Sequence, residues 1–480
     1  MVRMVFLALL VPQGALAGGY YFSDSGIVAL SRGGAWVAGA DNQFAQRYNP
    51  AGLIRTERPT VNVGWTGVDQ AVTFNARDED GNPAESCADE NGDLVECDPV
   101  VNRAPPFNVP QLGFATPFQV GNQDFAFAFG MHSPYAPAYQ YDEEGAQRYA
   151  VKNSEIFQFS LGPSIAWRPH PVVTIGAGLN VQMFWVEQTL DLTTFGRADP
   201  SNDIGIKLNA GDFFTPGFDL GVMIDPVEQL TIGLSLTPGS SYNALGSVGI
   251  DFEGNALELG AYQDGRCEVA SDFAPGDEGC QSDDGISLAI QLPVVARAGV
   301  AVRPVEALEV EVAFVYQRWS SMQDLVVDDV DIGIVNPLSG DIEQVDSQFV
   351  IPQNLNDTWS IRLGGQYRIN ELLELRAGGF YEPGAVDPEF VTVSLVDSDK
   401  FQVGGGGSIY VADESLRIDF AGAGVFMSDI AVRDSQVRLQ NAEVLNDETV
   451  VVGNGNYKSG GWLVGLQASY AFGERKREER

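Results

Sequence analysis

The feature that most constrains the fold is an alternation of apolar and polar side chains that recurs from about residue 58 onward. In segment 308–316 every second residue is apolar, and Glu309 and Glu311 lie between them. Successive side chains of a strand point to opposite faces, so this segment has one apolar and one polar face. The alternation therefore predicts a chain built mainly of strands. It recurs in segments 157–165, 359–367, 416–420 and 462–472.

The composition of the two faces indicates what surrounds these strands. The polar faces carry small residues together with charges such as Glu309, Glu311 and Asp419. On the pattern alone, a soluble sandwich with its apolar faces packed inside is the alternative. An outward apolar band around a polar lumen is typical of a barrel in lipid, where closure pairs every backbone group. We therefore predict an all-β fold, a transmembrane antiparallel β-barrel.

The connections between the strands alternate in length. At one end they are short, as at 168–171, 225–227 and 303–305. Short periplasmic turns and long external loops are the arrangement of outer-membrane barrels. Seven long loops predict about fourteen strands. They run near 75–107, 133–153, 191–213, 244–285, 321–354, 386–400 and 429–457.

Composition excludes two classes of protein. Lys and Arg number 28 against 65 Asp and Glu, which gives a formal net charge of −37. Such a chain lacks the basic face that nucleic acid requires, so we expect no nucleic-acid partner. No apolar run reaches the roughly 18 residues of a membrane-spanning helix, which excludes a helical membrane protein.

The sequence has few features of a catalytic or cofactor-binding site. It contains no nucleophile elbow, no P-loop and no zinc-protease helix, and its histidines are His132 and His170. The acidic loops lack the spacing of an EF-hand. We therefore expect no enzyme activity, no cofactor and no metal site. His132, at the end of a predicted strand, is instead a candidate for ligand contact.

The two ends and the cysteines indicate an exported protein. Residues 1–17 have a positive start, an apolar stretch and a small-residue cleavage site before Gly18, which predicts a signal peptide. The four cysteines form two local pairs in polar stretches, and two loop disulfides are the simplest account in an oxidising compartment. A four-cysteine metal site is the weaker alternative. The pairs are Cys87 with Cys97 and Cys267 with Cys280.

Residues 18–57 break the alternation. They are small and apolar in character, and they are too few to form a domain of their own. Such a segment can fold only against something else, so we predict a plug inside the barrel, called the hatch below. The barrel itself is predicted over residues 58–472, and a charged tail over residues 473–480.

An ordered series of short motifs resembles one known family. The series resembles the outer-membrane long-chain fatty-acid transporters, the FadL-like proteins that include aromatic-hydrocarbon channels of the TodX type. The resemblance implies a fourteen-stranded barrel closed by an N-terminal hatch. The motifs lie at 34–42, 49–53, 133–135, 162–167, 292–299, 316–320, 357–364, 376–378 and 397–400.

The resemblance also implies a route. Family members capture a hydrophobic molecule at an external groove, pass it to a lumen pocket and release it sideways where the third strand is kinked. Asn49, Pro50 and Ala51 match the hatch motif that touches the kink. Gly130 and Pro134 can break the ladder, because glycine weakens a strand and proline removes a donor. By turn chemistry alone, residues 49–51 could instead be a turn before the first strand.

A fatty acid needs an apolar slot and a cation or donors for its carboxylate. Arg297, Arg362, Arg376 and Arg417 are the head-group candidates, and their alternative role is to pair with lumen acids. Apolar loop residues are the candidates for the external groove. These are Phe195, Phe213, Phe214, Leu257 and Leu259.

The predicted function is passive uptake of a long-chain fatty acid or a similar hydrophobic compound across the bacterial outer membrane. An aromatic-hydrocarbon channel of the same fold and a surface protein such as an adhesin are the alternatives. A hydrophilic porin would need an open lumen, which a plug argues against. The predicted partners are a hydrophobic small molecule, outer-membrane lipid or lipopolysaccharide, and the outer-membrane assembly machinery. The tail after Phe472 and the cysteine pairs depart from the family.

Overall fold

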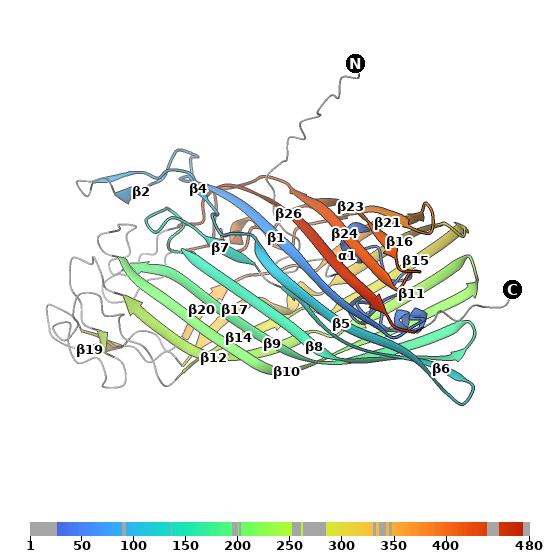
Figure 1. Cartoon of the computed structure of the whole chain (residues 1–480). Coiled ribbons are helices and arrows are strands. Elements are labelled where there is room, and N and C mark those ends of the chain that lie inside the picture. Colours follow the sequence, from blue (N-terminus) through green and yellow to red (C-terminus); the bar gives the residue numbers. More distant parts are fainter. Residues whose placement is uncertain are drawn as a thin grey trace, which may run out of the picture.

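A computed structural model of the chain forms a closed antiparallel β-barrel of 14 strands (Figure 1). The barrel closes between β1 (Thr60–Ala76) and β26 (Gly455–Ala471), which pair over their whole length. The fold class predicted from the alternation is therefore confirmed. The structure describes residues 26–88, 93–135, 137–193, 200, 203–251, 261–262, 285–329, 333–335, 342–344, 348–438 and 451–473.

Several barrel strands are interrupted, so that two shorter segments continue each other. Proline accounts for two of these interruptions, Pro238 and Pro293, because it cannot donate to the ladder. The remaining barrel strands, grouped as they continue each other, are β4 and β5 (Val100–Val101, Phe107–Val120), β6 and β7 (Gln123–Tyr135, Ala138–Gln140), β8 (Asn153–His170), β9 (Val173–Thr193), β10 (Asp203–Val227), β11 and β12 (Leu230–Thr237, Ser240–Asp251), β14 and β15 (Ile286–Leu292, Val295–Val305), β16 and β17 (Leu308–Gln317, Asp324–Asp328), β20 and β21 (Gln348–Pro352, Thr358–Arg368), β22 (Leu373–Glu382), β23 (Lys400–Val411), and β24 and β25 (Leu416–Met427, Ile430–Val432).

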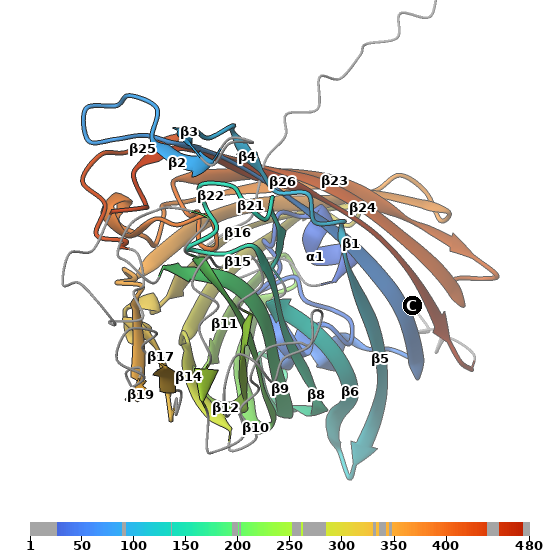
Figure 2. The same ribbon diagram turned by 90° about the vertical axis from the view of Figure 1, so that its left-hand side faces the viewer.

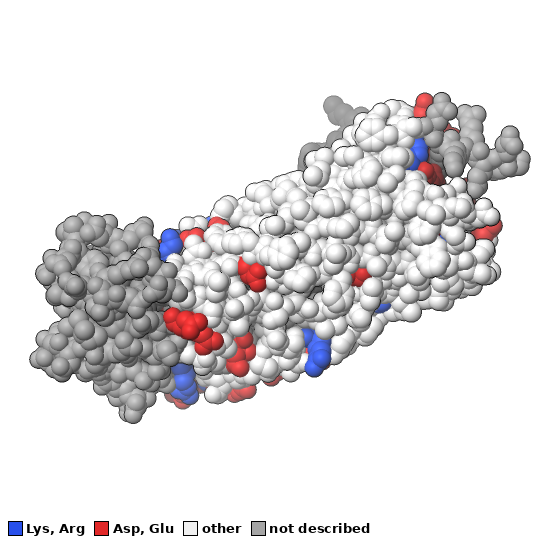
Figure 3. Space-filling view, turned by 90° about the horizontal axis from the view of Figure 1, so that it is seen from below, with Lys and Arg blue, Asp and Glu red and all other residues white. Residues whose placement is uncertain are grey.

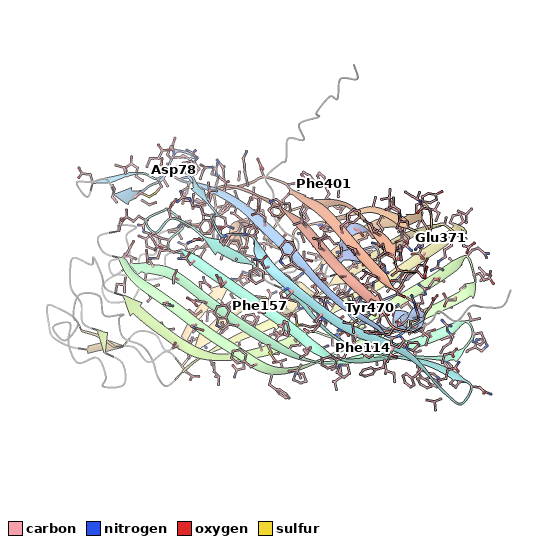
Figure 4. All side chains as sticks on the ribbon, viewed as in Figure 1. Asp78, Phe114, Phe157, Glu371, Phe401 and Tyr470 are labelled. Atoms are coloured by element: carbon pink, nitrogen blue, oxygen red, sulfur yellow. A yellow bond between two sulfur atoms is a disulfide. The ribbon has the colours of Figure 1, made fainter. Side chains whose placement is uncertain are left out.

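The two faces of the wall lie as the alternation predicts. On β16, Val312 and Phe314 are exposed on the outside, whereas Glu311 is fully buried toward the lumen. Phe401 and Tyr470, labelled in Figure 4, are about half exposed on β23 and β26. The face seen in Figure 3 carries few charged side chains between its two ends. This apolar outer wall is what a barrel in lipid requires.

The boundary of one loop differs from the prediction. The loop expected over residues 191–213 is shorter, because β10 begins at Asp203. Phe213 and Phe214 therefore lie within a strand, at a register shift between Asp212 and Thr215. A bulge of this kind inserts an extra residue and interrupts the two-residue period, which hid the strand in the sequence.

The described part of the hatch lies inside the barrel, toward the end with the short turns (Figures 1 and 2). It contains α1 (Ile27–Ser31), α2 (Ala45–Tyr48) and the 3-10 helix η1 (Pro50–Arg55). Asn49 caps η1 by accepting a hydrogen bond from the Ala51 N–H, and Pro50 occupies the first position. Within the described ranges, no helix is long and apolar enough to span a membrane.

Smaller elements cover the end with the long loops. The hairpin of β2 (Glu85–Ala88) and β3 (Leu94–Glu96) holds the Cys87–Cys97 disulfide, which confirms the first predicted pair. The second pair, Cys267 and Cys280, lies outside the described residues, as do the predicted signal peptide and residues 474–480 of the tail. The other small elements are β13 (Ala261–Tyr262), β18 (Gly333–Val335), β19 (Ile342–Gln344), η4 (Trp319–Ser321) and η5 (Pro388–Phe390).

Candidate functional site

A cavity lies inside the barrel at the end with the long loops, and is called the mouth cavity below. It offers about 100 Å³ to the centres of water-sized molecules, several times the roughly 10–15 Å³ that one water needs. Its wall is mainly apolar, with Phe184 from β9, Leu208 from β10 and Ile290 from β14. A mostly apolar cavity with a few polar groups is the usual form of a small-molecule site.

The polar groups of the mouth cavity come from several elements. They include the hydroxyls of Thr392 and Ser394, the amides of Gln188 and Gln353, and the guanidinium of Arg438. Such a lining offers hydrogen bonds to one part of a ligand while the rest contacts apolar side chains. An amphipathic molecule therefore fits the mouth cavity.

The segment 141–152, which contributes Tyr149 and Ala150 to the wall of the mouth cavity, is firmly held. Arg148 pairs with Asp203 at 2.6 Å and donates to the Ser86 carbonyl of the disulfide-bonded hairpin at 2.9 Å. Tyr149 donates to Asp203 at 2.8 Å, and burial raises the pKa of its phenol, so that it keeps the proton it donates. Tyr141 donates to the Val393 carbonyl at 2.8 Å. These contacts fix the shape of the mouth cavity.

None of the four candidate arginines lines the mouth cavity. Arg376 lies 2.6 Å from Glu374 and 3.3 Å from Asp419, and Arg417 lies 3.0 Å from Asp419. These contacts of Arg376 and Arg417 with lumen acids correspond to the bracing role that was the alternative. Arg417 also lines a second, polar cavity at the short-turn end, beside Asp41.

The other two arginines make different contacts. Arg362 lies 3.8 Å from Glu382 and stacks over the Phe380 ring at 4.5 Å. Arg297 donates to Thr237 at 3.2 Å. Both are buried on the inner wall, where they contribute to its polar lining.

The candidates for the external groove lie partly elsewhere. Phe213 and Phe214 are 64% and 76% exposed on β10. These exposed rings lie on a strand of the wall and do not line the mouth cavity. Phe195, Leu257 and Leu259 lie outside the described residues.

The hatch is anchored to β16 by two neighbouring carboxylates. Glu311 accepts hydrogen bonds from the N–H groups of Val37, Ala38 and Gly39 at 2.6 to 2.9 Å. Arg32 pairs with Glu309 at 2.7 Å and with Glu311 at 3.2 Å, and all three side chains are buried. The sequence shows both carboxylates on the lumen face of a strand, but it does not show their partners.

The Asn49 motif contacts the wall at β9 and β10. The Asn49 amide donates to the carbonyls of Val37 and Val222, each at 3.0 Å. Pro50 and Ala51 lie so close to Gly176 and Gly221 that a side chain there would overlap them. The motif therefore joins the anchored part of the hatch to the wall.

The third strand is irregular beside the hatch. Pairing of β6 with β8 shifts register between His132 and Tyr135, close to Pro134. Pairing of β6 with β5 ends at Leu112 and Met131, although β5 continues to Phe107. We call this end of the β5–β6 pairing the ladder break. Gly130 is still paired on both sides, and buried His132 lies 3.4 Å from Gln46 of the hatch.

Comparisons with known proteins agree with this architecture. The model of a family described as outer membrane protein transport protein (OMPP1/FadL/TodX) matches residues 8–472. The chain belongs to this family. The OMPP1/FadL/TodX proteins are outer-membrane transport proteins for hydrophobic compounds. No curated protein sequence matches the chain.

Solved structures of the OMPP1/FadL/TodX fold cover nearly the whole chain. A Pseudomonas aeruginosa FadL homologue is 18% identical with a TM-score of 0.71, and the alignment covers 96% of this chain and 100% of that one. The Ralstonia pickettii toluene transporter TbuX is 15% identical with a TM-score of 0.61, covering 94% and 99%. The Pseudomonas putida toluene transporter TodX is 14% identical with a TM-score of 0.61, covering 96% and 100%. At these identities the likeness establishes the fold.

Proposed function

We propose that this protein takes up a long-chain fatty acid or a similar hydrophobic compound by passive diffusion. The molecule enters the mouth cavity, passes the side of the hatch that faces β5 and β6, and leaves sideways at the ladder break. Catalysis has no part in this route. The observation that carries the proposal is the end of the β5–β6 pairing beside buried hatch residues. A gap in the wall lets an apolar molecule reach lipid without crossing the polar short-turn end.

Cross-linking the wall at the ladder break tests the sideways exit. If the β5–β6 register continued, Pro110 would lie opposite Ser133. We expect the variant Pro110→Cys/Ser133→Cys to lose uptake of labelled oleate when a short bifunctional thiol reagent joins the two positions. Phe114→Cys/Phe129→Cys is the matched control, because this pair lies in the continuous ladder. Undiminished uptake through the cross-linked break would show that the exit lies elsewhere.

Aromatic-hydrocarbon uptake is the second candidate, favoured by the likeness to two proteins described as toluene transporters. Binding of labelled oleate to the purified barrel, competed by unlabelled oleate or toluene, separates the two. Saturable binding displaced by oleate alone supports the fatty acid, and displacement by toluene alone supports the hydrocarbon. A barrel that binds neither would point to a surface-binding protein.

The proposal also includes export and insertion into the outer membrane. We infer that residues 1–17 direct export and are removed, and that the assembly machinery inserts the barrel into the outer membrane, where lipopolysaccharide surrounds its outer leaflet. Amino-terminal sequencing of the purified barrel tests the cleavage. A mature start at Gly18 is the expected result.

A further inference from the structure

The disulfide-bonded hairpin is a small sheet of its own. β2 and β3 pair with each other in a two-stranded sheet that is separate from the barrel sheet. An isolated two-stranded hairpin is marginally stable in water. The Cys87–Cys97 bond joins the two strands and limits the conformations that they can adopt. The position of the hairpin backbone therefore depends on the disulfide.

Two contacts connect the hairpin to the segment 141–152. The carbonyl of Ser86, one residue before Cys87, accepts a hydrogen bond from Arg148 at 2.9 Å. The Cys87 sulfur lies 3.3 Å from the Glu144 carbonyl oxygen. Both contacts are made by Cys87 or by its neighbour, so a change at the disulfide reaches this segment directly.

Arg148 connects the hairpin to the wall of the mouth cavity. Its side chain is 1% exposed, and its Nε donates to Asp203, at the start of β10, at 2.6 Å. Its Nη2 donates to the Tyr149 hydroxyl at 2.5 Å, and Tyr149 donates to Asp203 at 2.8 Å. Tyr149 lines the mouth cavity. One buried guanidinium thus holds together the hairpin, a strand of the wall and a lining residue.

The segment 141–152 also meets the cavity next to Tyr149. Ala150 lines the mouth cavity, and its carbonyl accepts a hydrogen bond from Gln188, another lining residue, at 3.3 Å. The backbone of Arg148 is held as well, because its carbonyl accepts from the Asp191 N–H at 2.9 Å. A displacement of Arg148 would therefore move a phenol, a methyl group and an amide of the lining.

We propose that the Cys87–Cys97 disulfide controls the affinity of the mouth cavity for its hydrophobic cargo, and that Arg148 is the positioning residue between them. With the bond formed, the Ser86 carbonyl holds the guanidinium, and Tyr149 stays in its place in the wall. With the bond open, the hairpin loses its constraint and the lining loses that support. A preorganised cavity binds more tightly, because less order is lost when the ligand enters. This proposal rests on the proposed function and adds a redox dependence to it.

Reduction of the disulfide tests the proposal on the wild-type protein. A dithiol reagent breaks the S–S bond to give two thiols and is itself oxidised to a disulfide. Saturable binding of labelled oleate to the purified barrel is measured before and after this treatment. We expect reduction to weaken binding about three- to tenfold, the range of one hydrogen bond, and reoxidation to restore it. Unchanged affinity after complete reduction would overturn the proposal.

The variant Cys87→Ser/Cys97→Ser assigns the effect to this bond, since the chain has four cysteines. We expect it to bind oleate as weakly as the reduced wild type does, and to show no further change with the dithiol. A variant that binds like the oxidised wild type and still responds to the dithiol would contradict the role of this pair.

Substitution of Arg148 tests the connection. Arg148→Lys keeps the charge but lacks the planar fork that reaches several partners, so we expect about three- to tenfold weaker binding. Arg103→Lys is the matched control, because Arg103 pairs with Asp142 of the same segment but both side chains are exposed. It should leave the affinity unchanged. Losses that add when Arg148→Lys is combined with the cysteine variant would show that the disulfide acts by another path.

Hydrogen exchange separates positioning from a general loss of stability. We expect reduction to speed up exchange at residues 145–152 and to leave β1 and β26 unchanged. Faster exchange throughout the barrel would mean that the disulfide only stabilises the fold. Oleate binding that reduction does not affect leaves the proposed function standing and rejects the redox dependence. If the oxidised barrel binds neither oleate nor toluene, the proposed function is wrong and the redox dependence fails with it.

Discussion

Toward β16 the hatch is held by buried charge, whereas toward β5 and β6 it is held by apolar packing, in which Phe44 belongs to one buried cluster with alanines of both strands. On the first side, the Glu311 carboxylate receives three backbone N–H groups and lies 3.2 Å from Arg32. On the second side, the Gln43 nitrogen and the Gln46 oxygen have no hydrogen-bond partner among the described residues. The contrast divides the hatch into an anchored part, residues 26–40, and an apolar-packed part, residues 41–48.

This difference indicates which part can move. A local opening that keeps buried ion pairs intact costs less than one that breaks them. The apolar-packed part adjoins the ladder break, so we expect a displacement there to widen the proposed exit. We expect the anchored part to stay in place.

The largest expected effect comes from removing the anchor. Glu311→Leu leaves three buried N–H groups without their acceptor and leaves Arg32 with Glu309 alone, which we expect to cost about 3–5 kcal/mol, as for a broken buried pair. We expect hydrogen exchange of residues 27–40 to speed up greatly and small sugars to enter liposomes that contain the barrel. Glu187→Gln, at an exposed pair with Lys207, should change neither. Unchanged exchange in the Glu311 variant would place the anchor elsewhere.

A smaller effect is expected where the hatch backbone meets the wall. Gly33 has φ +60°, and a side chain there would lie 2.3 Å from the Gly379 nitrogen. Gly33→Ala therefore combines backbone strain with overlap, and should destabilise the anchored part by about 2–4 kcal/mol. Gly121→Ala is the control, with φ +61° and, in the described part of the chain, no atom within 4 Å of an added side chain, so strain alone should cost about 1 kcal/mol. Thermal unfolding in detergent measures both, and equal shifts would argue against the close contact.

An intermediate loss of stability is expected at Asn49, which lies between the two parts of the hatch. Asn49→Ala removes the cap of η1 and two donated hydrogen bonds, for a loss of about 1–2 kcal/mol. We expect hydrogen exchange to speed up at the ends of both parts of the hatch, since Asn49 joins them. Faster hydrogen exchange confined to residues 41–48 would show that Asn49 belongs to the apolar-packed part alone.

The smallest effect on stability is expected from a substitution in the apolar-packed part. Gln46→Leu removes an oxygen that has no partner among the described residues and one long contact to His132, so unfolding should shift by less than about 1 kcal/mol. A large loss of stability would mean that this side of the hatch is also anchored.

The barrel could be predicted because alternation is local. Each strand shows in its own residues which face is apolar, as β16 does, and the loop lengths then give the strand count. Pro134 gave a local sign of the irregular third strand for the same reason. Phe213 and Phe214 were misplaced because a bulge interrupts the period in β10.

The packing of the hatch could not be predicted, because it depends on residues far apart in sequence. Glu309 and Glu311 were considered as partners for the candidate lumen arginines, but their partner in the hatch is Arg32, 277 and 279 residues away. The glycines against which the hatch packs are hard to recognise in the sequence, because Gly176, Gly221 and Gly378 occur among other small residues of the lumen face. Only the fold shows that the hatch backbone occupies the space of their missing side chains.

The anchor also sets an order of events during biogenesis. Arg32 leaves the ribosome long before Glu309 and Glu311, and it cannot find them until β16 has taken its place in the wall. Until then the hatch lacks the carboxylates that anchor it. The anchored part can therefore reach its final position only after β16 is in place.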